Sequence, residues 1–358
     1  MTEASLHNTQ ELDHEPDTRP LVSIVIVSWN ALETVKKCLP SVAQSSYENF
    51  EILFADNAST DGSAEWIAEH FPSVRIVRHP ENWAFCRGNN EAVRKARGTY
   101  VVLLNNDVEV TPDWLDPLVE HMELNPHVGA VQPKLLSYQD RTRFEYAGGA
   151  GGFLDRYGFP FTRGRLFFTL EQDEAQYDSV RNIFWATGAA LMTRKAVYDE
   201  LGGLDERLFM HMEEIDFCWR LQRRGYTIVC QPLSQVFHIG AASLKQGSTR
   251  KVFLNYRNNL LVLFKNLSRK RWRRVLVARI MLDGIAMLRA VLMLRPGESV
   301  AIFRAYMAAH KMKSSFEAER PALGEQSVDL PYQGNIVVDY FLLRRRVFSQ
   351  LSDDKFRL

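Results

Sequence analysis

Three clusters of polar side chains follow apolar runs in the first third of the chain. They span residues 28–30, 56–61 and 105–107, and each begins where a β-branched, strand-like run ends. In open α/β sheets the carboxyl ends of parallel strands meet at one edge, and ligands bind there. The carboxylates and amides of these clusters can accept hydrogen bonds from a ligand or hold a cation. The spacing therefore predicts one binding site at one edge of a sheet.

A second group of acids stands at the start of a helical pattern, in Glu213-Glu214-Ile215-Asp216. A carboxylate near an acceptor hydroxyl can act as a general base. These acids would also stabilise a helix N-terminus, and Asp216 is spaced to pair with Arg220 at i,i+4. Adjacent helical residues point about 100° apart, so we expect that Glu213 and Glu214 do not both face one hydroxyl.

The elements that must position these residues alternate between strand and helix. Strands are predicted at 21–29, 50–56, 74–78 and 99–107, with helices at 32–46, 63–70 and 89–97. This alternation indicates βαβ crossovers and a sheet covered on both faces. Residues 137–182 are rich in Gly and aromatic residues and are expected to form a long loop or a β-excursion that covers the site. A return strand at 185–193, a helix at 213–225 and strand segments at 226–232 and 235–243 complete this unit.

After residue 250 the pattern becomes helical. Six of the ten residues from Lys265 to Arg274 are basic, and residues 275–294 are very apolar but include Arg279, Asp283 and Arg289. Charges at helical spacing suggest amphipathic helices that lie on a surface, either a subdomain packed on the main unit or a membrane-contacting one. The basic residues beside Trp272 suit an anionic leaflet; they are Lys265, Arg269, Lys270, Arg271, Arg273 and Arg274.

The composition of the chain excludes several classes of protein. The chain has 358 residues, 46% of them hydrophobic, with 44 Lys+Arg against 43 Asp+Glu. A net charge of +1 argues against a dedicated nucleic-acid binder, so no nucleic-acid partner is expected. The four cysteines lack CxxC spacing and are expected to be reduced thiols of a cytosolic protein. The first twenty residues contain no apolar signal region, and no run of eighteen apolar residues predicts a membrane span. We therefore expect an intracellular protein.

The order of motifs resembles the family 2 glycosyltransferases, inverting enzymes of the GT-A fold, and in particular their rhamnosyltransferase-like members. The motifs, in order over residues 21–268, are VSIVIVSWN, DNASTDGS, ENWAFCRGNN, LLNNDVEV, WATGAALMTR, GGLDERLFMHMEEIDFCWR and HIGAAS. The resemblance implies an α/β fold of GT-A type, Rossmann-like, with a mainly parallel central sheet, helices on both faces and a C-terminal α-helical region. The expected organisation is a disordered polar tail at 1–20, a GT-A nucleotide-sugar transferase domain at 21–243 and a helical region at 244–358 that either contacts a membrane or only packs on the GT-A domain.

The resemblance also implies roles for the polar clusters. Asp56 would accept a hydrogen bond from the N3–H of uracil or thymine, with Ser28 and Asn30 close by, and Arg87 would contact a phosphate. Without the resemblance, DNASTDGS would be an Asx-turn or helix cap built from Asn57, Ser59 and Asp61.

The metal motif of the family is Asp-x-Asp, and this chain has Asn105-Asn106-Asp107 instead. Asp107 and His238 would hold Mg²⁺ or Mn²⁺, because one or two protein ligands suffice when phosphate oxygens complete the shell. Asn105 would hydrogen-bond the ribose or a metal-bound water, and Asn106 would belong to the same cofactor-binding site. Residue His238 could instead be a hydrogen-bonded core histidine.

The family signature Glu-Asp-x-Asp is matched by residues 213–216, which assigns the catalytic base to Glu214 although it replaces an Asp. The implied reaction is a single displacement that inverts the anomeric carbon. The donor would be dTDP-rhamnose or a UDP-sugar, and the acceptor a glycan or polyprenyl-diphosphate-linked glycan of bacterial surface polysaccharide. The expected location is the cytoplasmic face of the inner membrane, with peripheral contact.

Two alternatives remain at this point. The lost metal Asp and the Asp-to-Glu change suit a non-catalytic nucleotide-sugar-binding or scaffold protein. A sugar-nucleotide pyrophosphorylase would carry a Gly-rich basic loop after the first strand, where this chain has VSWNALET.

Overall fold

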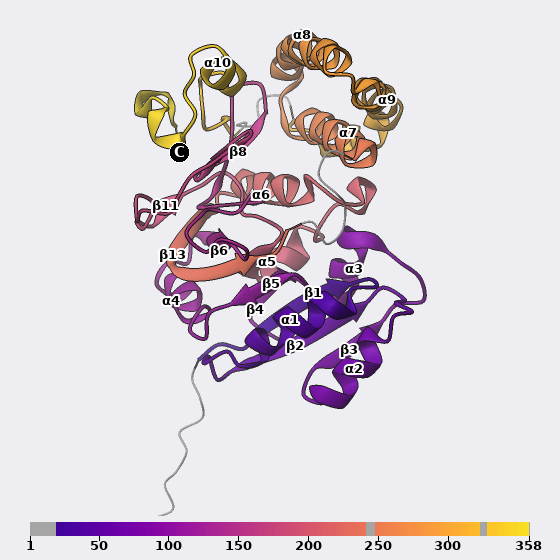
Figure 1. Ribbon diagram of the computed structural model, residues 1–358, viewed down its shortest axis with the longest axis vertical. Coiled ribbons are helices and arrows are strands. Elements are labelled where there is room, and N and C mark those ends of the chain that lie inside the picture. Colours follow the sequence, from indigo (N-terminus) through magenta and orange to yellow (C-terminus); the bar gives the residue numbers. More distant parts are fainter. Residues whose placement is uncertain (1–18, 241–247, 323–327, 358) are drawn as a thin grey trace, which may run out of the picture.

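A mixed nine-stranded sheet forms the centre of the protein, in the order β11-β13-β6-β12-β4-β1-β2-β3, with β5 paired to β13 (Figure 1). The computed structural model describes residues 19–240, 248–322 and 328–357. Most of the predicted tail at 1–20 therefore lies outside the described residues. The last three residues of the HIGAAS motif lie outside them entirely. The strands of this sheet are β1 (Val22–Ser28), β2 (Phe50–Asp56), β3 (Arg75–Arg78), β4 (Tyr100–Asn105), β5 (Val108–Val110), β6 (Val128–Ser137), β11 (Arg181–Asn182), β12 (Ala190–Arg194) and β13 (Thr227–His238).

The N-terminal half of the sheet is parallel, as the βαβ pattern predicts. Strands β4, β1, β2 and β3 run in one direction, whereas β12 is antiparallel to both β4 and β6. The predicted strand at 50–56 and helix at 63–70 match β2 and α2 to the residue. The sequence predicts two strand segments at 226–232 and 235–243, but the structure has the single strand β13. Pro232 has no N–H to donate, and a register shift between Gln231 and Gln235 accommodates it without ending the strand.

Helices cover both faces of the sheet, because side chains alternate across each buried strand. Ile24 and Ile26 of β1 pack against helices on one face, and Val25 packs against helices on the other. The helices on the first face are α1 (Leu32–Ala43), α2 (Ser63–His70) and α4 (Asp116–Leu124). Those on the second face are α3 (Ala84–Val93), α5 (Lys195–Glu200), α6 (Glu213–Arg223) and α7 (Thr249–Asn266).

Helix α3 begins five residues before the predicted start at 89, which corrects that boundary. The side chain of Asn82 accepts a hydrogen bond from the N–H of Ala84 at 2.9 Å and so satisfies one of the free donors of the first turn. Gly88 lets this helix approach the sheet, because a Cβ there would lie 3.0 Å from Cγ1 of Val27. The first turn of α3 is thereby held at the carboxyl end of β1.

The Gly-rich middle segment is a β-excursion, one of the two forms expected for it. It contains a small antiparallel sheet of β7 (Gly152–Leu154), β8 (Pro160–Thr162), β9 (Arg165–Leu166) and β10 (Thr169–Leu170). Aromatic rings of this sheet pack on the C-terminal segment, with Phe153 and Phe161 against Phe348 and Phe356. The excursion therefore carries an aromatic core of its own with the end of the chain.

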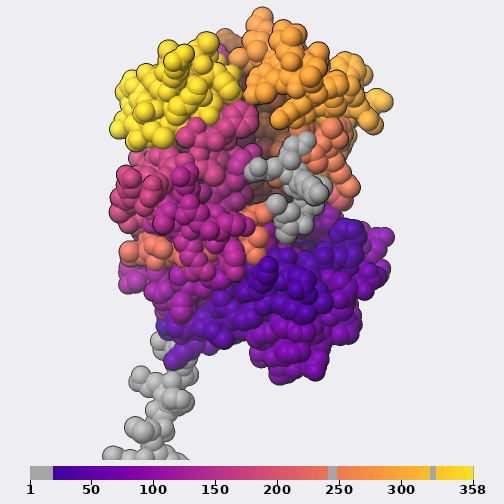
Figure 2. Space-filling view, viewed as in Figure 1, coloured from indigo at the N-terminus to yellow at the C-terminus, as the bar shows by residue number. Residues whose placement is uncertain are grey.

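The C-terminal helices form a layer at the end of the molecule opposite the parallel strands (Figures 1 and 2). Helix α7 packs on α6, α9 packs on α7, and α8 packs on α9. The remaining helices of this layer are α8 (Arg269–Leu292), α9 (Pro296–Met312) and α10 (Ile336–Phe341), with the 3-10 helix η2 (Lys313–Glu319) after α9. Across the described residues, every helix is too short or too polar to traverse a bilayer.

Candidate active site

The polar clusters that follow β1, β2 and β4 lie at one edge of the sheet. The parallel register pairs Ser28 with Asp56 and Val27 with Asn105, so the three strands end side by side. The amide of Asn106 donates a hydrogen bond to Ser28 Oγ at 2.8 Å and joins two of the clusters directly. The structure thus brings together Ser28, Asp56, Asn105 and Asn106, as their spacing predicts.

Asp56 is buried at the end of β2 and makes the turn that follows it. Its Oδ1 accepts a hydrogen bond from the N–H of Ser59 at 3.0 Å, and its Oδ2 lies 3.9 Å from a guanidinium nitrogen of Arg78. The Asx-turn expected of this segment is made by Asp61, one of the three residues named for it, whose Oδ1 accepts a hydrogen bond from the N–H of Ser63 at 3.1 Å. Asp61 accepts hydrogen bonds from the N–H groups of Leu32 and Ser63 and so supports the starts of α1 and α2.

Asn30 lies across this turn from β1, with a positive φ of 48°. Its side-chain oxygen accepts a hydrogen bond from the N–H of Thr60 at 2.8 Å, and its own N–H donates to Ser59 Oγ at 3.0 Å. The loops after β1 and β2 are therefore cross-linked into one rigid floor. Such a floor can orient a planar base against the carboxylate of Asp56.

Arg87 lies on the exposed side of α3 and stacks on the indole ring of Trp83, with its guanidinium carbon 4.0 Å from the ring centroid. The ring of Trp83 also stacks on that of His79, at a centroid distance of 4.5 Å. The imidazole of His79 lies 2.8 Å from the side-chain oxygen of Asn57, which follows Asp56. This stack fixes a cation beside the predicted nucleotide region, where a phosphate can pair with it.

Asp107 contacts His238 across the antiparallel pair of β5 and β13. Asp107 Oδ1 lies 3.1 Å from His238 Nε2, and the opposite ring nitrogen lies 3.2 Å from Glu145 Oε2. Burial by itself lowers the pKa of His238, but the two carboxylates outweigh burial and raise this pKa to about 10. The two carboxylates therefore favour a protonated imidazole at this position as long as no metal ion is bound.

The same residues fit a divalent cation. The 3.1 Å between Asp107 Oδ1 and His238 Nε2 matches the separation of about 3.0 Å expected for adjacent ligands of an octahedral ion at about 2.1 Å. Glu145 would then orient the imidazole from behind, as carboxylates do for metal-bound histidines. Within the described ranges, no three acidic, His or Cys side chains form a complete metal site. A cation held by Asp107 and His238 would therefore need further ligands from outside this pair of side chains.

Glu145 lies in the Gly-rich excursion, and sequence reasoning did not identify it. A backbone turn after β13 makes room for it: Gly240 has φ of 66°, and a Cβ there would lie 2.9 Å from Glu145 Oε1. A lone Glu among glycines and aromatics has no motif to mark it. Its role depends on a fold that brings the excursion to the end of β13.

Glu213 and Glu214 begin helix α6 as a pair of acids, of which Glu213 is buried and Glu214 is half-buried. Burial raises the pKa of both, and the charge of Glu214 raises that of Glu213 further, well above its usual value. The pKa of Glu214 rises to about 7. Each carboxyl group perturbs the pKa of the other, so the two titrate as a pair. In the first turn, long side chains can fold back toward the helix N-terminus and meet.

The backbone before α6 is strained. Phe209, His211 and Met212 have φ of 70°, 69° and 70°, values that residues other than glycine seldom adopt. The buried amide of Asn258 on α7 lies 2.8–2.9 Å from the carbonyl oxygens of Leu208, Met210 and His211. Strain of this kind persists where the surroundings over-determine it and is concentrated at functional sites. Helix α7 therefore fixes the loop that aims the acid pair.

Contacts connect the acid pair to the edge that holds Asp107. Gly188 lies between them: a Cβ there would be 3.8 Å from Glu213 Oε1, and the next residue, Ala189, accepts a hydrogen bond from the N–H of Asn105. On the other side, Thr187 Oγ1 donates to the carbonyl of Ala147, whose N–H donates to Glu145. The Thr187–Ala189 turn therefore lies between the acid pair and the Asp107–His238 pair and contacts residues next to both.

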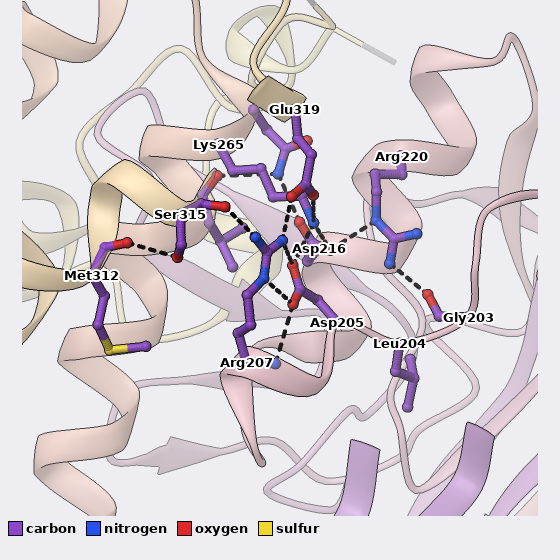
Figure 3. A network of polar contacts seen from close by, with 12 residues as sticks. Gly203, Leu204, Asp205, Arg207, Asp216, Arg220, Lys265, Met312, Ser315 and Glu319 are labelled. Carbon is purple, nitrogen blue, oxygen red and sulfur yellow. Dashed lines mark hydrogen bonds and ion pairs between the residues drawn. The ribbon is translucent and has the colours of Figure 1, made fainter. Parts of the chain in front are cut away.

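Asp216, the third acid of the motif, belongs to a structural network (Figure 3). It accepts from Arg220 Nε at 2.8 Å, the i,i+4 pair expected from the sequence, and from Lys265 Nζ at 2.9 Å. Burial opposes ionisation, but Arg220 and Lys265 hold the pKa of Asp216 well below its usual value. Lys265 also contacts Asp205 at 2.8 Å and Glu319 at 3.0 Å. This network anchors α7 and η2 on α6.

Lys265 was expected on a basic surface, and this expectation is wrong. Its side chain is 2% exposed because three acids from distant parts of the chain surround it. Arg271 and Arg269 are also paired, with Asp329 and Glu317. A cavity of about 350 Å³ lies beside the network and is lined by three cations and three acids: Arg207, Arg220, Lys265, Asp205, Glu206 and Glu319. Its charges are balanced within the cluster.

Comparison with known proteins agrees with this architecture. The sequence profile of glycosyl transferase family 2 matches residues 23–202. An O-antigen biosynthesis protein of Myxococcus xanthus is 32% identical over 63% of this chain and 18% of its own length. An N-acetylglucosaminyl-diphospho-decaprenol L-rhamnosyltransferase of Mycobacterium tuberculosis is 26% identical over 77% of this chain and 93% of its own length. The chain spans less than a third of the length of two curated relatives that it matches.

Among solved structures, the fold is similar to that of GalNAc-T7 with UDP, GalNAc and Mn²⁺. The TM-score is 0.58 at 17% identity, over 89% of this chain and 60% of that one. This likeness confirms the expected α/β fold of GT-A type with an added C-terminal helical region. Together with the profile match over half of the sequence, it shows that the chain belongs to glycosyl transferase family 2.

Proposed function

We propose that this protein is an inverting hexosyltransferase that moves a sugar from a nucleoside diphosphate to a hydroxyl of a glycan acceptor. The observation that carries the proposal is the position of Glu214 in the first turn of α6, directly after a strained loop, where burial raises its pKa to about 7. A general base works best when its pKa lies near the working pH, because much of it is then deprotonated and it is still basic enough to accept a proton. The Asp107–His238 pair supplies the other requirement, a place for the leaving diphosphate.

In this mechanism the loops after β1 and β2 bind the nucleoside. Asp56 accepts the N3–H of a uracil or thymine, while Ser28 and Asn30 line the same edge. Arg87, held against Trp83, pairs with a phosphate. Asn105 and Asn106 position the ribose or a bound water. We propose the domain limits expected from the sequence, with residues 21–243 forming this transferase unit and residues 244–358 a helical region.

Glu214 then takes the proton of the acceptor hydroxyl as the oxygen attacks the anomeric carbon. Glu213, whose pKa lies well above its usual value, stays protonated and donates a hydrogen bond to Glu214. A divalent cation held by Asp107 and His238, Mn²⁺ or Mg²⁺, would supply positive charge to the departing diphosphate. Attack from the face opposite the leaving group inverts the configuration, and no covalent enzyme intermediate forms.

For the donor we propose dTDP-rhamnose first and UDP-sugars second, since the M. tuberculosis relative is named as an L-rhamnosyltransferase. For the acceptor we propose a glycan on a polyprenyl diphosphate at the cytoplasmic face of the inner membrane, because the same name specifies a diphospho-decaprenol substrate. The M. xanthus relative is named for O-antigen biosynthesis, which supports a role in bacterial surface polysaccharide.

A donor panel tests this function. Purified protein is incubated with dTDP- and UDP-sugars, Mn²⁺ and polyprenyl-linked acceptors, and release of free nucleoside diphosphate is measured. We expect release that depends on both a specific donor and an acceptor, and a product whose anomeric configuration is opposite to that of the donor by NMR. Tight binding of nucleotide without turnover for any donor would favour the non-catalytic alternative. A product of retained configuration would refute the single displacement.

A further inference from the structure

Helix α8 buries charged side chains and exposes apolar ones, the opposite of what is usual for a helix on a protein surface. Its charged residues Arg279 and Asp283 are each only 2% exposed, on the side that faces α7 and α9. Arg279 donates to Asp283 at 3.1 Å and to the side chain of Asn259 on α7, and Tyr306 of α9 donates to Asp283 at 2.6 Å. The opposite side of α8 is apolar and faces outward.

The outward stripe of α8 is continuous. Its members recur at helical spacing and are each 57–74% exposed: Val277, Met281, Ile285, Leu288 and Leu292. Leu294, just after the helix, is 90% exposed. Exposed apolar residues scattered singly are ordinary, but a contiguous stripe over four turns marks a surface that contacts something apolar.

The stripe extends onto neighbouring elements. Arg289 lies over the ring of Phe168 at 5.5 Å, and Phe168 lies 6.4 Å from the ring of Phe341 at the end of α10. The next two residues, Leu342 and Leu343, are also exposed. Figure 1 shows α8, α9 and α10 at the same end of the molecule. We call the stripe of α8, Phe168 and residues 341–343 the outer apolar face.

Positive charge surrounds this face. Arg273, Arg274, Arg289 and Arg295 are exposed on or beside α8, and Arg344 follows the apolar end of α10. In the sequence from 269 to 312 the acids are Asp283, which is buried, and Glu298. An apolar surface with a basic border complements the acyl chains and anionic head groups of one bilayer leaflet. A symmetric contact with a second copy would instead bring these arginines together.

We propose that the outer apolar face docks the protein onto an anionic membrane surface, with α8 lying in the plane of the leaflet. No described helix can span a bilayer, so the contact is peripheral. The proposal differs from docking through the basic run at 265–274, because Lys265 is buried and the apolar side chains supply most of the affinity. It deepens the proposed function by identifying the surface that meets a lipid-linked acceptor, but the contact itself requires neither donor nor acceptor.

Vesicle co-sedimentation without substrates tests the proposal. We expect wild-type protein to bind vesicles of phosphatidylcholine and phosphatidylglycerol, and to bind pure phosphatidylcholine much less. The double variant Met281→Glu/Leu288→Glu should partition about 100-fold more weakly, since each buried side chain of this size contributes roughly tenfold or more. The variant Arg273→Gln/Arg274→Gln should weaken binding to anionic vesicles about 25-fold, at roughly fivefold per basic residue.

The matched control is Leu124→Glu/Leu233→Glu, which adds the same charges at two leucines that are 74% and 71% exposed on α4 and β13. It should bind vesicles like wild type. Thermal unfolding checks that each variant folds, and the dependence of wild-type binding on lipid charge tests the proposal without any variant. Equal binding by wild type and Met281→Glu/Leu288→Glu would overturn the proposal. So would a wild-type dimer that ignores vesicles and becomes monomeric in that variant. Failure of the donor panel alone would leave the membrane contact intact.

Discussion

The substitution Lys265→Met removes the cation at the centre of the network in Figure 3 while keeping the length of the side chain. Lys265 Nζ lies 2.8 Å from Asp205, 2.9 Å from Asp216 and 3.0 Å from Glu319. Removing one partner from a buried ion pair typically costs about 3–5 kcal/mol, because a charge is left uncompensated. Asp216 retains Arg220 and Asn266, and Asp205 retains Arg207, so we expect a loss of about 3 kcal/mol in the free energy of unfolding.

At the usual entropy of unfolding per residue, this loss lowers the melting temperature by about 4 °C for a cooperative chain of this size. The assay is thermal and urea unfolding followed by circular dichroism at neutral pH. Lys270→Met is the matched control, because Lys270 is exposed on the first turn of α8, and its change should stay within about 0.5 kcal/mol.

The dependence on pH separates this network from simple packing. The pKa of Asp216 and that of Asp205 are lowered in the folded protein: burial opposes ionisation, but the neighbouring cations outweigh it. A lowered acid pKa gives stability that is present above the unfolded value near 4 and is lost as the pH falls through the folded value. The difference between wild type and Lys265→Met should therefore be full at pH 7 and shrink below about pH 4. A difference under about 0.5 kcal/mol at pH 7, or one that grows on acidification, would refute the reasoning.

Three further predictions concern the active site. The pKa of Glu214 near 7 predicts that kcat/KM rises with pH along a limb of unit slope and falls about fivefold between pH 7 and pH 6; a profile that stays flat from pH 5.5 to pH 8 would contradict this. Glu145→Gln should weaken Mn²⁺-dependent binding of UDP or dTDP by about 10–100-fold in calorimetry, while metal-free nucleotide binding changes little. Asp56→Asn should raise the dissociation constant for UDP or dTDP by about tenfold or more without altering the melting temperature by more than about 2 °C, and unchanged affinity would remove Asp56 from the base site.

The parallel half of the sheet could be predicted from sequence because local patterns determine it. The β-branched run at 50–56 and the amphipathic pattern at 63–70 match β2 and α2, and the polar ends of the strands meet where the topology requires. The clusters at 28–30, 56–61 and 105–107 lie together for the same reason. Element type and edge position depend on residues close in the sequence, which a single chain displays.

The residues that were missed or misplaced depend on contacts between distant segments. Lys265 belongs to a basic run, yet Asp205, Asp216 and Glu319 bury it, and no local pattern brings these four together. Glu145 reaches His238 only because the Gly-rich excursion returns to the end of β13. The strained loop before Glu213 and Glu214 is held by Asn258 of α7, which donates to its carbonyl oxygens, and no local pattern brings Asn258 to that loop.

The sequence predicts that α8 is amphipathic, but it leaves open which side of the helix faces the protein. Arg279, Asp283 and Arg289 interrupt an apolar stretch at helical spacing, which indicates an amphipathic helix but does not tell which side faces inward. The structure buries Arg279 and Asp283 and leaves the apolar stripe outside, because Asn259 and Tyr306 supply partners for the buried charges. Tertiary hydrogen bonds determined the orientation, and hydrophobicity alone would have predicted the opposite one.

The substitution Glu214→Gln tests the central claim most directly, because it keeps the size of the side chain and removes its ability to accept a proton. Transfer from the preferred donor and calorimetric binding of its nucleoside diphosphate with Mn²⁺ are measured on the same preparation, with Glu120→Gln on the exposed side of α4 as the control. The account predicts that transfer falls by about 10²–10⁴-fold while the dissociation constant changes by less than about twofold. Transfer within about tenfold of wild type at unchanged affinity would contradict the assignment of Glu214 as the base.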